Sequence, residues 1–345
     1  MKKLFISIIS FIFMVSCTGC YVLGQAMPYL SQRGGAKDIG KMLNEPGLDE
    51  KTRNFLDLVL DIKSFASRIG LKVDQNYLHY KKLDKDYLAV VVSACSPFSF
   101  EPFMWDYPFL GKMPYKGFIK EDGVKAEVEA LKKKGLDVFV RKVQAFSSLG
   151  FFKDPLYSFM AEYSVYDLAD LLMHEQTHAT IYVSNQSQFN EELATFVGKK
   201  AAESFVIFRY GKESKEYKDI ALNKQDSEAF RKLILGLKAG LEKLYSGDRD
   251  EADMTMAKKR MFDEFKADLE AHYDQYFVTE NYKGLASLEL NNAYLSLFST
   301  YHQDSEIYEE LFNKFDKDLP AFITRVLTLK NSKDPKGEIR GWLKG

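Results

Sequence analysis

Apolar residues recur at every third or fourth position over most of this chain, which is the spacing of one face of an α-helix. The first such stretch is Glu50–Gly70, and Gly70 marks the expected end of that helix. After Gly198 the helical spacing continues to about Val326. The helices predicted in this part are Ala201–Arg209, Ser227–Leu244, Ala252–Phe277, Leu288–Phe298 and a final group within Asp304–Val326. We expect the many charges of Ala252–Phe277 to form a solvated face.

A different pattern precedes these helices. Asp86–Cys95 is β-branched and apolar, as a buried strand would be, and Tyr115–Ile119 and Leu136–Phe146 are further strand candidates. A helix is expected between them at Gly123–Lys134. This order of strands and helix predicts a small mixed sheet. The chain is therefore expected to be an α+β protein, mostly helical, with the sheet in the N-terminal half and helices in the C-terminal half.

One more strand candidate, Ser147–Phe152, is expected to end at Lys153–Pro155. An edge strand here would bind an extended peptide through its free backbone N–H and C=O groups. The pattern alone supports a simple connection equally well.

The next segment contains the candidate metal-binding residues. Ser164 with Asp167 resembles a capping box, and a mostly apolar run follows it to Met173. The run leads into His174-Glu-Gln-Thr-His178. Residues four apart lie on one face of a helix, so His174 and His178 can point two imidazoles at one metal ion. Because the chain has only five histidines, a chance match to this spacing is rare.

A catalytic zinc ion has three protein ligands and one open position, so a third ligand is needed. Glu191 is the obvious candidate, since it follows the turn-like stretch Ser184–Ser187 and is expected to begin a helix that folds back on the first. Glu175 is placed to hold and deprotonate a water as general base. The alternative is a metal-free pair of polar residues on an exposed face. The apolar run argues against it, because buried imidazoles need a partner.

Hydrolysis of a peptide bond also needs a donor for the developing oxyanion. Tyr301 and His302 are the candidates by residue type. Tyr301 is one of twenty tyrosines, so a place in the core is an open alternative.

The amino terminus has the composition of a targeting segment. Lys2 and Lys3 precede an apolar stretch, Leu4–Val15, that is too short for a confident membrane span. A small residue followed by cysteine then resembles a bacterial lipoprotein signal, with Cys20 as the lipidated residue and Cys17 as the rival. An ordinary cleaved signal is the alternative. We expect a signal peptide at 1–19, a tether at 20–49 and a buried Cys95.

Composition narrows the picture further. The 345 residues suffice for one large domain or two smaller ones, and no boundary stands out. We therefore treat 50–345 as one metallopeptidase-like domain with a sheet-containing part at about 50–163, the zinc helices at 164–210 and a helical part at 211–345. The formal net charge of −1, with lysine and glutamate spread throughout, predicts no nucleic-acid surface.

Several stretches together resemble the putative bacterial aminopeptidase family, a group of lipoprotein-like zinc peptidases of the gluzincin type. The likeness covers most of the mature chain. Its main stretches are Gly19-Cys20, Phe98–Pro102 with Trp105, Lys134–Val138, Ser147–Pro155, His174–His178, Phe189–Val197, and Asn291–Ala293 with Tyr301.

The resemblance implies a gluzincin-like fold, a peptide substrate, Zn²⁺ held by His174, His178 and Glu191, and Glu175 as catalytic base. It also implies that a strand containing Ser148, Leu149 and Gly150 lies beside the substrate, and it favours roles for Asn292 and Tyr301 there.

Two residues of this comparison need comment. Gln176 stands where the family pattern has an apolar residue, and on a helix it points away from the ligand face. An exopeptidase also needs a group, often a carboxylate, to hold the free amino terminus of its substrate. Glu192 and Glu101 are available, and nothing in the sequence selects either.

Two functions are compatible with the sequence. The first is a zinc-dependent peptidase, in particular an aminopeptidase, held at the bacterial cell envelope by a lipid anchor. The second is a non-catalytic envelope lipoprotein that binds a ligand or partner, with zinc structural or absent. The presence of all three ligands and the base favours the first.

Overall fold

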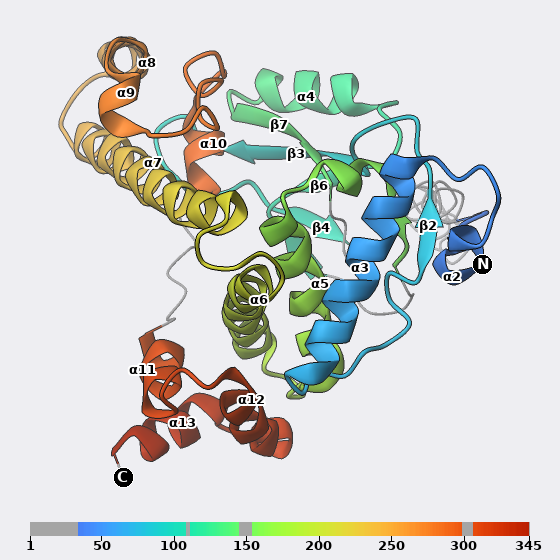
Figure 1. Ribbon diagram of the computed structural model, residues 1–345. Coiled ribbons are helices and arrows are strands. Elements are labelled where there is room, and N and C mark those ends of the chain that lie inside the picture. The colour runs from blue at the N-terminus through green and yellow to red at the C-terminus, as the bar shows by residue number, and fades with distance from the viewer. Residues whose placement is uncertain (1–33, 108–110, 145–153, 299–305, 345) are drawn as a thin grey trace, which may run out of the picture. The chain divides into compact units, whose positions relative to one another are not determined.

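Figure 1 shows the computed structural model, which describes residues 34–107, 111–144, 154–298 and 306–344. These residues form an α+β fold with small sheets in the N-terminal half and helices in the C-terminal half, as predicted. They group into two compact units. Among the described residues, unit 1 draws on 85–107, 111–144 and 224–298, and unit 2 draws on 35–84, 154–223 and 306–344. Each unit thus combines stretches that lie far apart in the sequence.

Unit 1 contains a three-stranded and a two-stranded sheet, with helices packed on the larger one. Its elements are β3 (Ala89–Cys95), β4 (Trp105–Tyr107), β5 (Gly111–Met113), β6 (Lys116–Phe118), α4 (Val124–Lys133), β7 (Asp137–Val143), most of α7 (Lys215–Tyr245), α8 (Glu251–Ala271), α9 (Tyr273–Tyr276) and α10 (Asn292–Ser296). The strand order in the larger sheet is β6-β3-β7, and both pairings are antiparallel.

Both faces of this larger sheet are covered, which explains why every residue of β3 is buried. Neighbouring residues of a strand point to opposite faces. Val138 of β7 packs with Leu131 of α4, whereas Phe139 packs against the core formed by α7, α8 and α10. The apolar run that ends at Cys95 is therefore a strand buried on two sides, as predicted, and Cys95 is buried with it.

Unit 2 is mostly helical. Its elements are β1 (Lys37–Asp38), α2 (Ile39–Leu43), α3 (Glu50–Arg68), β2 (His79–Lys81), β8 (Leu156–Tyr157), the 3-10 helix η1 (Ser158–Glu162), α5 (Val165–Thr180), α6 (Ser187–Tyr210), α11 (Glu306–Lys314), α12 (Leu319–Leu327), the 3-10 helix η2 (Thr328–Asn331) and α13 (Pro335–Lys344). Helix α5 packs along α6, and α3 contacts both of them (Figure 1). The strands form a sheet of order β1-β2-β8.

The structure corrects several predicted boundaries. Helix α6 begins at Ser187 rather than at Glu191, because Asn190 N–H already donates to the carbonyl of Gln186. Helix α8 stops at Ala271. Helix α10 covers five residues instead of the predicted Leu288–Phe298, because the Asn291 side chain accepts from Tyr294 N–H and caps it there. Strand β8 and helix α13 were not predicted.

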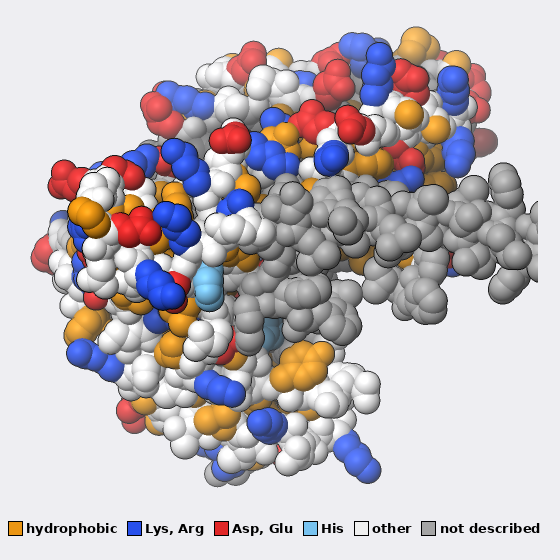
Figure 2. Space-filling view, turned by 90° about the vertical axis from the view of Figure 1, so that its right-hand side faces the viewer, with side chains coloured by type: hydrophobic (Ala, Val, Ile, Leu, Met, Phe, Trp, Pro, Cys, Tyr) orange, Lys and Arg blue, Asp and Glu red, His pale blue; other side chains and the backbone are white. Residues whose placement is uncertain are grey.

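The exposed surface carries charges of both signs. On the face drawn in Figure 2, the described Lys and Arg side chains alternate with Asp and Glu side chains, and no large region of one sign stands out. Along α8 the predicted solvated face is present, and Met256 is also 61% exposed. Within the described ranges, no helix combines the length and apolarity that crossing a bilayer requires.

Candidate metal centre

Helix α5 begins as the sequence predicts. The Ser164 hydroxyl accepts a hydrogen bond from Asp167 N–H (3.0 Å) and donates one to the Asp167 carboxylate (2.7 Å). The helix then buries Leu168, Leu172 and Met173 in the core of unit 2. This burial fixes the rotation of α5 about its axis, so the side chains of the next turn have defined directions.

The Asn190 side chain helps to hold the loop between α5 and α6. Asn190 is buried, its amide oxygen accepts from Val183 N–H (2.9 Å), and its amide nitrogen donates to the Val183 carbonyl (2.8 Å). Both hydrogen-bonding groups of Val183 are thereby satisfied at the point where the chain reverses. Asn190 precedes Glu191 directly, so this loop clamp also sets the position of the third predicted ligand. Asn190 lies within the family-like stretch Phe189–Val197, and no role for it was predicted from the sequence.

The three predicted ligands converge in unit 2. The Nε2 atoms of His174 and His178 lie 3.1 Å apart. Glu191 places one carboxylate oxygen 3.5 Å from His174 Nε2 and the other 3.5 Å from His178 Nε2. Both imidazoles are about one-fifth exposed, whereas the Glu191 side chain is 61% exposed. The site is thus open on the side of Glu191.

Donor atoms of the three residues lie close enough together to share one metal ion. Two ligand atoms at roughly 2.0–2.1 Å from a tetrahedral zinc ion lie about 3.3 Å from each other. The Nε2–Nε2 separation of 3.1 Å and the separations of 3.5 Å, one from each Nε2 to a different Glu191 oxygen, lie close to that value. Two imidazole nitrogens and one carboxylate oxygen are also a donor set that zinc accepts. His174, His178 and Glu191 therefore form a group that could hold a metal ion.

The charges of the site act strongly on one another. Hydrogen bonds from the two imidazoles lower the pKa of Glu191 far below its usual range, and this outweighs the effect of its partial burial. Burial opposes protonation of His174, but the hydrogen bond to Glu191 and the charge of Glu175 outweigh it and raise the His174 pKa. Burial also raises the pKa of Glu175, against the effect of both histidines. The negative charges of Glu175 and Glu191 favour protonation of their neighbours. A metal cation bound here would compensate these negative charges in place of the protons.

The two ligand-bearing helices cross closely at Gly198. A side-chain carbon at this position would lie 3.2 Å from His174 Cβ and 2.6 Å from the Asp170 carboxylate. Only glycine therefore lets α6 approach α5 this closely. Burial raises the pKa of Asp170 to about 6, although the charges of Lys199 and His174 act in the opposite direction. Neither Gly198 nor Asp170 was expected to matter from the sequence.

Gln176 departs from the family pattern, and its buried environment is unfavourable for a polar side chain. Its side chain is 1% exposed. Within the part of the chain that the structure describes, neither its amide nitrogen nor its amide oxygen has a hydrogen-bond partner. A buried amide without partners destabilises the folded state.

We expect the substitution Gln176→Met to raise the free energy of unfolding by about 1–3 kcal/mol, because it removes the unsatisfied amide and keeps the length of the side chain. Chemical denaturation of the metal-free protein measures the change. Gln225→Met, at an exposed position of α7, serves as the control and should change stability by less than about 0.5 kcal/mol. A loss of stability in Gln176→Met would contradict the prediction.

Glu192 follows the ligand Glu191 but has a different environment. Its side chain is 4% exposed and forms an ion pair of 2.7 Å with Lys336 of α13. Tyr308 of α11 and Gln188 also donate to it, at 3.2 and 2.9 Å. All of these partners lie in unit 2. Glu192 therefore joins the C-terminal helices to α6, and this use leaves it poorly suited to hold a substrate amine.

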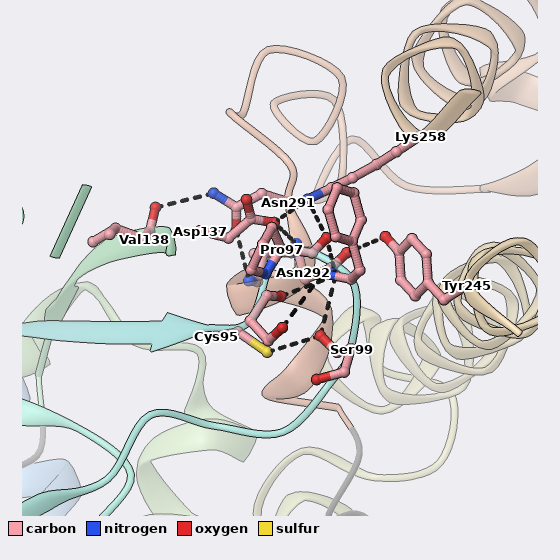
Figure 3. Close-up of polar contacts among 12 residues, drawn as sticks. Cys95, Pro97, Ser99, Asp137, Val138, Tyr245, Lys258, Asn291 and Asn292 are labelled. Atoms are coloured by element: carbon pink, nitrogen blue, oxygen red, sulfur yellow. Dashed lines mark hydrogen bonds and ion pairs between the residues drawn. The ribbon is translucent and has the colours of Figure 1, made fainter. Parts of the chain in front are cut away.

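Asn292 lies in unit 1, fully buried at the start of α10 (Figure 3). Its amide nitrogen donates to the carbonyls of Ser96, Pro97 and Ser99, and its amide oxygen accepts from the Tyr245 hydroxyl. The side chain thus stabilises the loop after β3. Its contact with substrate stays a prediction, and these hydrogen bonds give the residue a sufficient structural role.

Other predicted residues lie outside the described ranges. These are the lipidation candidates Cys17 and Cys20, the substrate-side residues Ser148, Leu149 and Gly150, and the oxyanion candidates Tyr301 and His302. Glu101, one of the two carboxylates considered for the substrate amine, is exposed in unit 1.

Comparison with known proteins identifies the family of this chain. A family model described as "putative aminopeptidase" matches residues 21–340, nearly the whole chain. No curated protein and no solved structure matches the chain. Because the match includes both ligand-bearing helices and extends over far more than half of the sequence, this chain belongs to the putative aminopeptidase family.

Proposed function

We propose that this protein is a zinc-dependent peptidase and, within that class, an aminopeptidase. The observation that carries the proposal is the convergence of His174, His178 and Glu191, whose ligand atoms lie close enough to hold one metal ion, next to the half-buried Glu175. Family membership supports peptides as the substrate class.

The residues of the site have different roles in the proposed hydrolysis. Zinc, when bound, supplies a Lewis acid that polarises the scissile carbonyl and makes water more acidic. Glu175 accepts a proton from the attacking water and delivers it to the nitrogen of the departing amine, so its carboxylate is regenerated at the end of each turnover. Partial burial raises the Glu175 pKa, which strengthens it as a base. In this proposal Tyr301 donates to the oxyanion, and the strand containing Ser148, Leu149 and Gly150 binds the peptide backbone.

A peptide-library digest read by mass spectrometry tests the proposal. The purified zinc-loaded protein should shorten peptides from the amino terminus, and a chelator should stop this cleavage. Adding back zinc should restore it. These three samples report activity, metal dependence and cleavage position together.

Stoichiometric zinc without cleavage of any peptide would instead favour the second function, a binding lipoprotein with a structural metal. Cleavage that persists in the fully chelated protein would contradict the proposed chemistry.

For localisation we propose a lipid anchor at Cys20, or at Cys17, in a bacterial cell envelope. The support is the apolar segment followed by small residues and cysteine. Metabolic labelling with palmitate tests this proposal, which fails if no label enters the protein.

A further inference from the structure

The candidate metal centre depends on the distance between two helices. His174 and His178 lie on α5, and Glu191 lies on α6. In a well-formed metal site the distances from the ion to its ligands stay within about 0.2 Å of their ordinary values. A residue that sets the separation of α5 and α6 therefore also sets how tightly the site can hold zinc.

The facing sides of the two helices run in opposite directions. Glu191 and Gly198 are two turns apart on α6, so they point in nearly the same direction. Asp170, His174 and His178 follow one another at four-residue spacing on one face of α5. Glu191 faces His174 and His178, whereas Gly198 faces Asp170 and His174. His174 is thus the ligand that both parts of α6 approach.

The atoms nearest to Gly198 belong to the turn of α5 that carries His174. A side-chain carbon at position 198 would lie 2.6 Å from the Asp170 carboxylate, 3.1 Å from the Asp170 carbonyl oxygen and 3.2 Å from His174 Cβ. In an α-helix that carbonyl is the acceptor for the N–H of His174. Any group larger than hydrogen at position 198 would therefore press directly on the turn that places one of the ligands.

Rotation of a side chain cannot relieve all of these contacts. The Asp170 carboxylate can swing away, but the Asp170 carbonyl oxygen and His174 Cβ move only with the backbone of α5. Carbon atoms in favourable contact lie about 3.5–4.0 Å apart, so a methyl group would displace this turn by roughly 0.3 Å or more. That displacement is larger than a metal site tolerates, and it would move His174 away from Glu191.

We propose, on the basis of the zinc-dependent function above, that Gly198 is a positioning residue of the metal centre. Without a side chain there, the turn of His174 comes close enough to α6 for this imidazole to share a metal ion with Glu191. Glycine inside a helix is less stable than alanine, so its place within the 24 residues of α6 needs such a reason. Asn190 fixes the start of α6 through Val183, and Gly198 sets the helix separation further along.

Zinc affinity, measured by competition with a chromophoric chelator, tests this role. Gly198→Ala should raise the Kd for zinc about 10- to 100-fold, which is the usual effect of replacing a residue that orients a metal ligand. Circular dichroism of the metal-free variant should show the helix content of the unchanged protein. Gly236→Ala is the matched control, because an added carbon at this exposed position of α7 meets no atom within 4 Å. It should leave the Kd for zinc unchanged.

A second pair of variants separates the helix spacing from the Asp170 carboxylate. Asp170→Ala removes the nearest of the three contacts and gives the reference Kd. Adding Gly198→Ala to it retains the contacts with the carbonyl oxygen and with His174 Cβ, and should again weaken zinc binding about 10- to 100-fold. This pair also answers the question if Gly198→Ala alone does not fold.

An unchanged Kd for zinc in Gly198→Ala would overturn the assignment, as would a loss of affinity that disappears in the Asp170→Ala background. Neither measurement depends on peptide cleavage. The proposed function fails separately, if the zinc-loaded protein with Gly198 intact cleaves no peptide.

Discussion

The substitution Glu175→Gln is expected to lower kcat for peptide hydrolysis by about 10²–10⁴-fold while the protein keeps its zinc. Glutamine has the shape of glutamate but cannot accept the proton of the attacking water. The side chains of His174, His178 and Glu191 do not change, so their separations of 3.1, 3.5 and 3.5 Å should remain. Steady-state kinetics on a peptide substrate, together with metal analysis of the same preparation, measures both parts of the prediction.

A matched control separates the base from a general effect of losing a negative charge. Glu310→Gln makes the same chemical change at an exposed position of α11 in unit 2. Its activity should equal that of the unmodified protein. Turnover that survives intact in Glu175→Gln would exclude this residue as the base. Loss of zinc together with activity would show that Glu175 supports the metal centre instead.

Removal of the Lys336 ammonium group is expected to cost about 3–5 kcal/mol of folding stability. Glu192 is 4% exposed, and its ion pair with Lys336 is 2.7 Å long. In Lys336→Met the Glu192 carboxylate stays buried without that cation, although Tyr308 and Gln188 still donate to it. Chemical denaturation of the metal-free protein measures the loss.

The cause can be checked with two companion variants. Lys336→Met combined with Glu192→Gln removes the uncompensated charge and should recover most of the stability. Lys37→Met breaks the ion pair between Lys37 and Glu45, in which the two side chains are 61% and 46% exposed. This substitution should cost less than about 1 kcal/mol of folding stability. If Lys336→Met is no more harmful than Lys37→Met, the buried pair does not hold the C-terminal helices to α6.

The position of Glu192 also bears on the metal centre. It is adjacent in sequence to Glu191, and its partners come from α11 and α13. The aromatic rings of Phe196, Tyr308, Phe312 and Phe322 pack together in the same region. The C-terminal helices of unit 2 thus brace the turn of α6 that carries the third ligand. This explains why a segment more than a hundred residues away belongs to the same compact unit.

Local signals predicted the parts of the site that depend on one helix. The cap at Ser164 and the apolar run after it set where α5 begins and which face it buries, and the four-residue spacing then brings His174 and His178 together. The buried strand β3 was equally clear, because a strand covered on both faces is nearly continuous in apolar side chains, and Ser93 is its one polar residue. Short elements such as α10 and β8 were missed or misplaced, since caps and pairing partners rather than periodicity define them.

The sequence by itself determined the ligand types, their spacing and the helices that carry them, because hydrogen bonding within a helix depends on nearby residues only. The tertiary structure decided which of two neighbouring glutamates faces the histidines and which pairs with Lys336. Successive residues on a helix differ by about 100° in direction. The contacts that each of these residues makes depend on segments that are distant in the sequence. No local sequence pattern indicates which segments these are.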